Sequence, residues 1–429
     1  MPPEPRLALN ARRYPDRAAI ATGDERASWA ELHERAAGVA GALAGHGVRP
    51  GQRVALALPA GLDFAVALHA VLLLGAAVLP VDLRLAEGER AERAAAADHV
   101  VDALPPPGGG VEPVADRDDA VALAVHTSGT TSAPKLVELT WANVTANALG
   151  SAIALGFDRR ERWLCPLPLA HVGGLMVLMR SLVYGTAAHL LPPPFDADRA
   201  VDALMEDGIT LASLVPTMLA RMLDAGLCRT RSLRAVLLGG APADPALLTR
   251  AAAAGVPVAQ TYGLTEACSQ VTTSAPGEPE TAGWPLPGVQ VELASDGEIL
   301  VCGPTVAGGG VLRTGDLGRF DARGRLTVVG RKADTIVTGG ENVAPAEVEG
   351  VLLAHPAVAE AGVFGRPHPE WGEAVTARVL LRAGAGVTPD ELRAFCGDRL
   401  ARYKVPKAIE LADGPLPRTA SGKLLRREL

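Results

Sequence analysis

The first part of the chain alternates between short apolar runs and longer segments in which apolar residues recur every three or four positions. A capping-box pattern at Ser28–Glu31 precedes such a segment, which predicts a helix over Leu32–Leu43. Val54–Leu58 predicts a strand, Phe64–Leu74 a buried helix, and Ala76–Leu79 a second strand. This β-α-β alternation predicts a parallel or mixed sheet covered by helices.

The same alternation continues along the chain. Short apolar runs predict further strands at Val121–Val125, Trp163–Pro166, Ala187–Leu191, Leu211–Val215 and Ala235–Leu238. The later part predicts strands at Leu326–Val329, Val358–Phe364 and Ala374–Leu381, a helix at Ala346–Leu353, and a second capping box at Thr388–Glu391. The pattern therefore predicts an α/β protein.

Composition narrows the classes of function. The chain has 429 residues, of which 48% are hydrophobic and 21% charged, which suits two or three domains with a large core. The net charge of −7 argues against a nucleic acid as the main partner. The five cysteines form no C-x-x-C pair, and their odd number suits a reducing compartment, so we expect a cytoplasmic protein.

We expect no membrane span and no targeting segment. The N-terminal stretch Met1–Arg6 has no apolar signal region. The longest nearly apolar run, Phe64–Leu79, contains His69 and Gly75 and is short for a bilayer. This run is therefore interpreted as a buried helix that leads into a strand.

A polar loop follows the apolar run Val121–Val125. Residues His126–Lys135 read HTSGTTSAPK, with five hydroxyl side chains around one glycine and a lysine at the end. Backbone N–H groups and hydroxyls of such a loop can bind phosphate oxygens, and the lysine adds a positive charge. The Walker spacing is absent. On this stretch alone, a polar surface loop is an equally good interpretation.

Two further clusters combine glycine with a functional side chain or a strand end. Pro166–Leu175 contains His171 beside the glycines 173 and 174, which let a ligand or backbone approach closely. A packed core histidine is the competing interpretation of His171. Leu238–Pro242 follows a predicted strand, where α/β sheets bind ligands, although a plain turn fits equally well.

Side chains suited to a nucleotide occur in two more segments. In Gln260–Glu266, Tyr262 can stack on a base and Glu266 can bind a hard cation such as Mg²⁺. In Leu312–Gly318, the single carboxylate of Asp316 can accept hydrogen bonds from ribose hydroxyls.

Together these segments resemble one family over nearly the whole chain. Six motifs occur in the order typical of adenylate-forming enzymes, the group of acyl-CoA synthetases, luciferases and peptide-synthetase adenylation domains: Thr127–Lys135, Tyr262–Glu266, Thr314–Asp316, Gly330–Arg331, Gly339–Asn342 and Gly422–Lys423. Each motif alone is weak, whereas six in order are specific. The resemblance implies a large N-terminal domain of mixed sheets over residues 1–329, a hinge at residues 330–334, and a small mobile α+β domain over residues 335–429.

The resemblance also implies which residues bind ATP, Mg²⁺ and CoA. The ATP site would contain Thr127, Ser128, Gly129, Thr130, Thr131 and Lys135 at the β- and γ-phosphates, Gly240, Ala241, Tyr262 and Gly263 near adenine, Thr265 at the α-phosphate, and Asp316 and Arg331 at the ribose. Glu266 would bind Mg²⁺, and Lys423 would bridge the acid's carboxylate and the α-phosphate during adenylation. Gly339 and Gly340 would line the pantetheine tunnel.

Within the family, the chain is most similar to the o-succinylbenzoate–CoA ligases of menaquinone biosynthesis. The similarity lies in Pro168–Gly185, Leu237–Pro242 and Thr265–Thr272. That acid has one carboxylate that reacts and an aromatic carboxylate that must be anchored. The resemblance assigns the anchor to Arg180, the pocket wall beside the reacting carboxylate to His171, and a further substrate contact to Gly239. A structural ion pair is the competing interpretation of Arg180.

The chain departs from the family pattern at three places. Ser132 occupies a position where the loop usually has glycine, Ala333 replaces the usual hinge Asp or Lys, and Pro304–Arg313 is shortened.

Three other functions stay open: a CoA ligase for another aryl, fatty or short-chain acid, a stand-alone adenylation enzyme that loads a carrier protein, and a non-catalytic nucleotide-binding protein.

The C-terminal tail is basic. Arg393–Leu429 contains nine Lys or Arg and four Asp or Glu, a net charge of +5. This is either a solvated basic face or a surface that anionic CoA approaches. The expected partners are thus a carboxylic acid, ATP and CoA. The sequence leaves open the oligomeric state, a homodimer included, and the resting orientation of the C-terminal domain.

Overall fold

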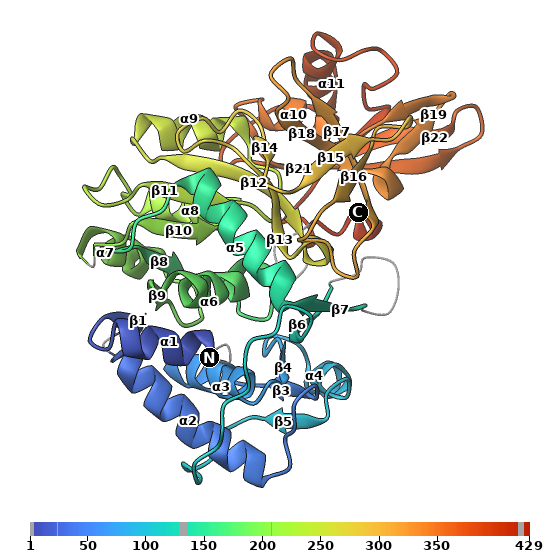
Figure 1. Cartoon of the computed structure of the whole chain (residues 1–429). Coiled ribbons are helices and arrows are strands. Elements are labelled where there is room, and N and C mark those ends of the chain that lie inside the picture. Colours follow the sequence, from blue (N-terminus) through green and yellow to red (C-terminus); the bar gives the residue numbers. More distant parts are fainter. Residues whose placement is uncertain (1–3, 24, 128–134, 207, 419–423) are drawn as a thin grey trace. The chain divides into compact units, whose positions relative to one another are not determined.

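A computed structural model describes residues 4–23, 25–127, 135–206, 208–418 and 424–429. The chain divides into two compact units, whose elements are labelled in Figure 1. The first unit contains Met1–Gly240, Thr249–Val291 and Val301–Leu312, and the second contains Ala241–Leu248, Glu292–Leu300 and Arg313–Leu429. A hinge at residues 330–334 between domains of residues 1–329 and 335–429 stays a prediction.

A nine-stranded mixed sheet forms the centre of the first unit. Its strands, in spatial order, are β14 (Trp284–Pro285), β13 (Ser269–Thr273), β12 (Val258–Leu264), β11 (Ala235–Leu238), β10 (Leu211–Leu214), β8 (Arg162–Cys165), β9 (Ala187–Leu190), β1 (Ala18–Thr22) and β2 (Glu25–Ser28). The six strands from β12 to β1 are parallel, whereas β13 pairs in the antiparallel direction with both β12 and the edge strand β14, and the other edge strand, β2, pairs in the antiparallel direction with β1. Strands β10 and β11 are buried throughout, which explains their continuous apolar sequence.

A second sheet of the first unit has five strands. Their order is β5 (His99–Val101), β3 (Arg53–Leu56), β4 (Ala77–Pro80), β6 (Val121–His126) and β7 (Leu136–Thr140). The first four strands are parallel, and β7 pairs with β6 in the antiparallel direction. The β6–β7 connection is the predicted phosphate-binding loop.

Helices cover these sheets and join them. The helices of the first unit are α1 (Arg6–Arg13), α2 (Trp29–Gly45), α3 (Leu62–Leu73), α4 (Glu87–Ala94), α5 (Trp141–Leu155), α6 (Val172–Tyr184), α7 (Ala197–Glu206) and α8 (Pro216–Asp224); α9 (Pro245–Ala253) lies where the chain passes between the units. Helix α3 contacts β3 and β4 of one sheet and β1 and β2 of the other, so nearly all of its residues are buried. The prediction of a buried, non-spanning helix is confirmed.

The second unit contains most of a four-stranded sheet and all of a five-stranded one. The four strands are β15 (Gln290–Leu293), β16 (Glu298–Cys302), β17 (Val311–Phe320) and β18 (Leu326–Arg331). The other sheet contains β20 (Glu341–Val343), β19 (Ile336–Thr338), β22 (Gly372–Leu381), β21 (Val358–His368) and β23 (Ala408–Leu411). Helices α10 (Pro345–Leu353) and α11 (Pro389–Gly397) pack with this sheet, so this part is α+β.

The predicted elements agree with the structure within two residues at nearly every end. Both capping boxes are confirmed, because the side chains of Ser28 and Thr388 each accept a hydrogen bond from the third helical N–H, and their backbone N–H groups donate to the side chains of Glu31 and Glu391. Strand β21 is an exception, since it extends four residues past Phe364. The added residues include Pro367 and have no apolar pattern, but they pair with the start of β22 in a hairpin.

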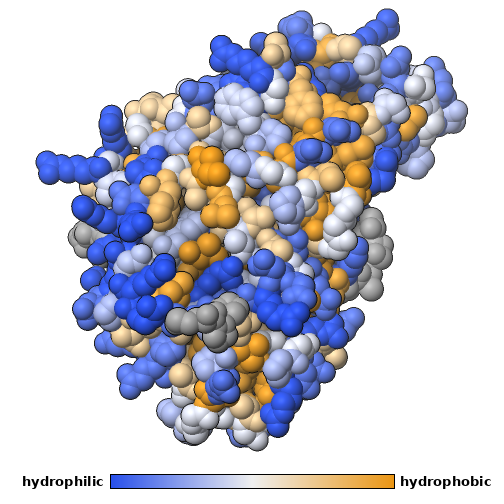
Figure 2. All heavy atoms as spheres, viewed as in Figure 1, coloured by the Kyte–Doolittle hydropathy of each residue, from blue (hydrophilic) through white to orange (hydrophobic). Residues whose placement is uncertain are grey.

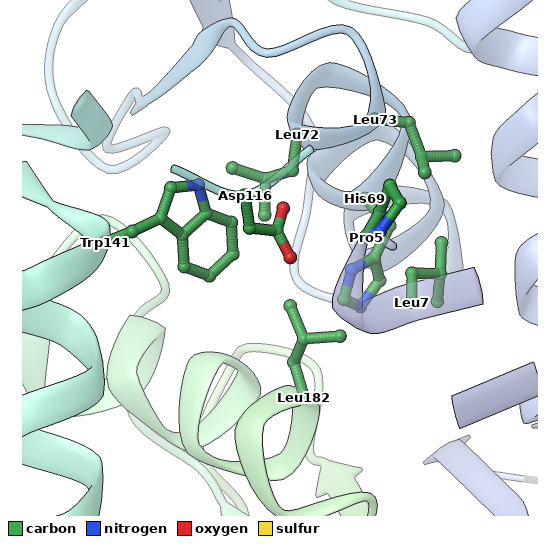
Figure 3. A pocket seen from close by; sticks show the side chains of 8 residues that line it. All are labelled: Pro5, Leu7, His69, Leu72, Leu73, Asp116, Trp141 and Leu182. Carbon is green, nitrogen blue, oxygen red and sulfur yellow. The ribbon is translucent and has the colours of Figure 1, made fainter. Parts of the chain in front are cut away.

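Figure 2 shows charged and polar residues over most of the visible face, with smaller apolar areas among them. Among the described helices, no segment is long and apolar enough to cross a membrane. One small cavity in the first unit, of about 10 Å³, is lined by residues that include His69, Asp116 and Trp141 (Figure 3). It contains none of the predicted site residues and is about the size of one water.

Candidate active site

The ends of the predicted phosphate-binding loop meet at the carboxyl end of β6. His126 pairs with Leu136 in the antiparallel ladder, and the Thr127 N–H donates to the Lys135 carbonyl over 2.9 Å. The Thr127 hydroxyl donates to the same oxygen over 3.3 Å. The stem therefore holds Thr127 and Lys135 together. Ser128, Gly129, Thr130, Thr131 and Ser132 lie outside the described residues.

The glycines after β11 lie beside β12. Leu238 pairs with Gln260 in the parallel register, which places Gly239 next to Thr261. A Cβ atom at Gly239 would lie 2.7 Å from the Thr261 methyl carbon, and Gly240 has φ +81°. Both positions therefore require glycine. Ala241 follows directly and is exposed, so this segment lies at the carboxyl edge of the parallel strands, as predicted for a ligand site.

A β-bulge shapes the segment from Tyr262 to Glu266. The register of β12 and β13 shifts between Tyr262 and Gly263, and a Cβ at Gly263 would lie 1.7 Å from the Ser269 carbonyl oxygen. Tyr262 is nearly buried, with 9% of its surface exposed. Thr265 and Glu266 begin a short 3-10 helix, η1 (Thr265–Ala267). Leu264 still pairs with Ser269, and Thr265 and Glu266 leave the ladder where η1 begins.

The turn after η1 has an uncommon backbone. Cys268 has φ +57° and Ser269 has φ +100°, which non-glycine residues rarely adopt. The Glu266 carbonyl accepts the Ala307 N–H over 2.8 Å and fixes the start of η1. In the described part of the chain, no group of three or more His, Cys, Asp or Glu side chains is arranged to hold a metal ion.

His171 lies at the N-terminus of α6 in a cluster that the sequence analysis did not find. The Arg84 Nη2 atom donates to His171 Nε2 over 3.0 Å, and Asp82 Oδ2 lies 3.6 Å from the same nitrogen. Asp82 also accepts from Arg84 Nε over 2.8 Å and from Nη2 over 2.6 Å. Burial raises the pKa of Asp82, but Arg84 and then His171 more than offset this, so the net pKa lies below its ordinary value.

Arg84 and Asp82 follow β4, at the carboxyl edge of the five-stranded sheet. Their position directly after a parallel strand was the sequence feature that could have placed them at a ligand site.

The glycine at position 174 is explained by close packing, because a Cβ at Gly174 would lie 2.6 Å from the Pro168 carbonyl oxygen. Gly173 has no comparably close neighbour.

Arg180 is completely buried in α6 and has neutral partners. Its Nη2 donates to the Asn147 Oδ1 over 2.8 Å and to the Ser269 hydroxyl over 3.4 Å. Its guanidinium carbon lies 5.3 Å from the centre of the Trp163 ring. It forms no ion pair with any carboxylate of the described residues, which removes support from the competing interpretation as a structural ion pair. Burial lowers the pKa of Arg180.

Asp316 and Arg331 form a pair in the second unit. They are register partners on β17 and β18, and Arg331 Nε lies 2.9 Å from Asp316 Oδ1. The Asp316 side chain is 8% exposed and that of Arg331 is 49% exposed. The Thr314 hydroxyl accepts the Asp316 N–H over 3.1 Å and donates to the Ile299 carbonyl over 2.8 Å. The pairing of β17 with β18 therefore holds the Asp316 carboxylate and the Arg331 guanidinium side by side.

The predicted hinge continues from β18 into the short helix η2 (Lys332–Asp334). Lys332 Nζ contacts Asp296 over 2.5 Å and Glu298 over 3.3 Å. Hydrogen bonds from Lys332 to these two carboxylates raise its pKa. Asp334 pairs with Arg426 over 2.8 Å. Side-chain contacts on both sides of Ala333 thus hold the segment in this conformation.

The remaining predicted site residues are Gly339, Gly340 and Lys423. Gly339 and Gly340, with φ +58° and +83°, form the two-residue turn between β19 and β20. Lys423 lies outside the described residues, but the chain on either side is joined by a bridge between Arg418 and Leu424. In the basic tail, Arg426 is half-buried and also contacts Glu349 over 2.8 Å, so it is not a free cation for CoA.

Comparison with protein families identifies the chain as a member of the AMP-binding enzyme family. That family matches residues 7–102 and 98–311, and the AMP-binding enzyme C-terminal domain matches residues 347–423. The fold class predicted from the sequence is thereby confirmed.

Two curated relatives match nearly the whole chain. The 2-succinylbenzoate--CoA ligase of Bacillus licheniformis is 38% identical, over 99% of this chain and 98% of its own length. The enzyme of the same name from Geobacillus kaustophilus is 40% identical, over 97% of this chain and 95% of its own length.

Solved structures agree with these relatives. The o-succinylbenzoate CoA synthetase (MenE) from Bacillus subtilis, in complex with the acyl-adenylate intermediate OSB-AMP, is 36% identical with a TM-score of 0.91, covering 99% of this chain and 98% of that one. The same protein has been solved with ATP and magnesium ion, at the same TM-score. MatB from Rhodopseudomonas palustris, bound to ATP, is 28% identical with a TM-score of 0.88, covering 98% of this chain and 97% of that one.

Proposed function

We propose that the protein is an ATP-dependent o-succinylbenzoate–CoA ligase that forms an acyl adenylate and then transfers the acyl group to CoA. The main support is the set of relatives with that activity in their names, at 38–40% identity over almost the full chain. The name MenE of the solved relative supports a place in menaquinone biosynthesis. We also propose that the protein acts in the cytoplasm and that it forms a homodimer.

In the first step, a carboxylate oxygen of the acid attacks the α-phosphorus of ATP, and pyrophosphate leaves. Because this brings anions together, cations near the reacting atoms lower the barrier. We assign Thr127, Lys135 and the loop between them to the β- and γ-phosphates, and Lys423 to the reacting carboxylate and α-phosphate. Thr265 is placed at the α-phosphate.

The nucleoside is assigned to two segments. Gly239–Ala241 and Tyr262–Gly263 offer backbone and an aromatic ring for adenine, since Gly239–Ala241 follows β11 at the carboxyl edge of the parallel strands. Asp316 is suited to ribose hydroxyls because its carboxylate is nearly buried and accepts hydrogen bonds. Arg331, with its Nε 2.9 Å from Asp316 Oδ1, adds a positive charge for the phosphate.

The donor set fits Mg²⁺. This ion usually binds one or two protein carboxylates together with substrate phosphates and water, and Glu266 supplies one carboxylate at a fixed start of η1. Bound there, Mg²⁺ would neutralise phosphate charge.

The acid is assigned to α6 and its surroundings. Arg180 offers an uncompensated buried charge for the aromatic carboxylate, through direct contact or through water. His171, held by Arg84, would form the wall near the reacting carboxylate.

In the second step, the CoA thiol attacks the acyl carbon and AMP leaves. We propose that rotation about residues 330–334 brings Gly339 and Gly340 to the pantetheine chain. Two adjacent glycines leave room for this narrow chain because they carry no side chains.

One experiment separates this function from its alternatives. Purified protein is assayed for ATP–pyrophosphate exchange with a panel of aryl, fatty and short-chain acids, and separately for CoA thioester formation. We expect both activities with o-succinylbenzoate. Exchange without thioester formation would indicate an adenylation enzyme that loads a carrier protein. A different preferred acid would indicate another CoA ligase, and no exchange with any acid would contradict an enzymatic function.

A further inference from the structure

The groups around Arg180 are all neutral, although the guanidinium is completely buried. Its partners are the amide oxygen of Asn147, the hydroxyl of Ser269 and the ring of Trp163. The Arg180 Nε–H has no acceptor in the described structure. A buried cation without an anion is costly, and most proteins pair it with a carboxylate. The fold therefore maintains an uncompensated positive charge here.

Asn147 occupies the position from which a carboxylate would neutralise that charge. It projects from α5, is completely buried, and differs from aspartate by one amide group. Its Nδ2 donates to the Gln270 carbonyl over 3.0 Å, which fixes the amide orientation and turns Oδ1 toward Arg180. Aspartate would have nearly the same shape but could not donate to Gln270. The backbone of β13 thus favours a neutral side chain at this position.

The contact to Ser269 connects Arg180 with the proposed ATP and Mg²⁺ segment. Ser269 follows Glu266 by three residues and has φ +100°. Such a backbone conformation persists only where its surroundings hold it, often at functional sites. Asn147 and Ser269 together fix the Nη2 edge of the guanidinium.

We propose that Asn147 is a positioning and specificity-determining residue, which orients Arg180 and, by being neutral, keeps its charge available to the second carboxylate of the acid. This inference rests on the proposed function, in which Arg180 anchors that carboxylate. In a buried environment the charge acts over several ångströms, so the effect holds whether the anion contacts Arg180 directly or through water.

The test is a substitution that gives Arg180 an internal anion. We compare kcat/KM of wild type and Asn147→Asp for o-succinylbenzoate and for 4-oxo-4-phenylbutanoate, which lacks the aromatic carboxylate. The ratio of the two values measures the preference for the second carboxylate. We expect the Asp variant to lower this ratio about 30-fold, as for loss of one buried charge pair.

Asn10→Asp is the matched control. Asn10 is also a buried amide that donates to a carbonyl, that of Leu182 in the same helix as Arg180, over 2.7 Å. The change therefore removes the same kind of hydrogen bond without placing an anion beside Arg180. We expect the Asn10 variant to keep the wild-type ratio, even if its melting temperature falls.

Asn147→Ala serves as a second variant in case the Asp variant does not fold. Without the amide oxygen, the guanidinium loses its orientation, and we expect the ratio to fall about fivefold, the value of roughly one hydrogen bond. Ratios within twofold of wild type would overturn the inference, because a purely structural Asn147 changes stability but not substrate preference.

The proposed function and this inference fail in different ways. If wild type does not use o-succinylbenzoate but prefers another dicarboxylic acid, the function is wrong and the ratio is measured with that acid and its monoanionic analogue. If wild type prefers the dianion and both Asn147 variants keep that preference, only the inference is wrong.

Discussion

Two arginines of this protein lie in opposite electrostatic settings. Arg331, in the second unit, is half-exposed and pairs with the carboxylate of Asp316 at 2.9 Å. Arg180, in the first unit, is fully buried and contacts an amide, a hydroxyl and an indole ring. The first arrangement orients a carboxylate for a ligand that donates hydrogen bonds. The second holds a cation for a ligand that brings its own negative charge.

The largest effect is expected when Asp316, the carboxylate that pairs with Arg331, is removed. Asp316→Ala should lower kcat/KM for ATP about 100-fold, because two hydrogen bonds from ribose hydroxyls to a charged group are lost. ATP–pyrophosphate exchange measures this. Asp321→Ala is the control, since Asp321 follows β17 and pairs with Arg325 over 2.7 Å. Equal ATP dependence of the two variants would contradict the ribose assignment.

Replacing Arg180 should weaken the use of the acid and leave the use of ATP unchanged. Arg180→Met should lower kcat/KM for o-succinylbenzoate about 30-fold, because a desolvated charge interaction is lost. KM for ATP should stay near wild type. Thermal unfolding should show no loss of stability, since an apolar side chain replaces a buried cation without a counter-ion. Intact activity on o-succinylbenzoate would break the comparison.

Asp82 and Arg84 provide a third setting, a partly buried ion pair that contacts His171. The net pKa of Asp82 is below its ordinary value of 3.8, so the pair stabilises the fold above that pH and the contribution disappears as the pH falls below it. Asp82→Asn should therefore cost at most ~1 kcal/mol at neutral pH. Urea unfolding across the acid range should show the difference from wild type closing below pH 3.8. A constant difference would exclude this ionisation as its cause.

The smallest effect concerns the basic tail. Arg426 is half-buried and pairs with Asp334 and Glu349, so reversing its charge would disrupt these contacts. Arg427 is exposed and is therefore the better probe. Arg427→Glu should raise KM for CoA about threefold, and the effect should shrink in high salt because exposed charges are screened. An unchanged KM would favour the alternative of a solvated basic face.

Much of the fold could be predicted because burial leaves a clear pattern. The continuous apolar runs at β10 and β11, and the capping boxes at Ser28 and Thr388, depend on neighbours in sequence. The end of β21 could not be predicted, since Gly365–His368 is held by pairing with β22 and not by its own apolar residues.

The site was predictable only as a set of motifs. Asp316 and Arg331 were both expected, and the β17–β18 register brings them together. Asn147, Ser269, Asp82 and Arg84 were missed, because each acts through a partner distant in the sequence. A buried asparagine in an apolar helix was the one local signal at Asn147, and it does not indicate which group it contacts.

The most direct test of the account is the preference of the wild-type enzyme for a second carboxylate. It requires kcat/KM for CoA thioester formation with o-succinylbenzoate and with 4-oxo-4-phenylbutanoate. An uncompensated buried Arg180 predicts that the dianion is preferred about 30-fold or more. Equal values for the two acids would contradict the account, because the buried charge would then have no part in choosing the substrate.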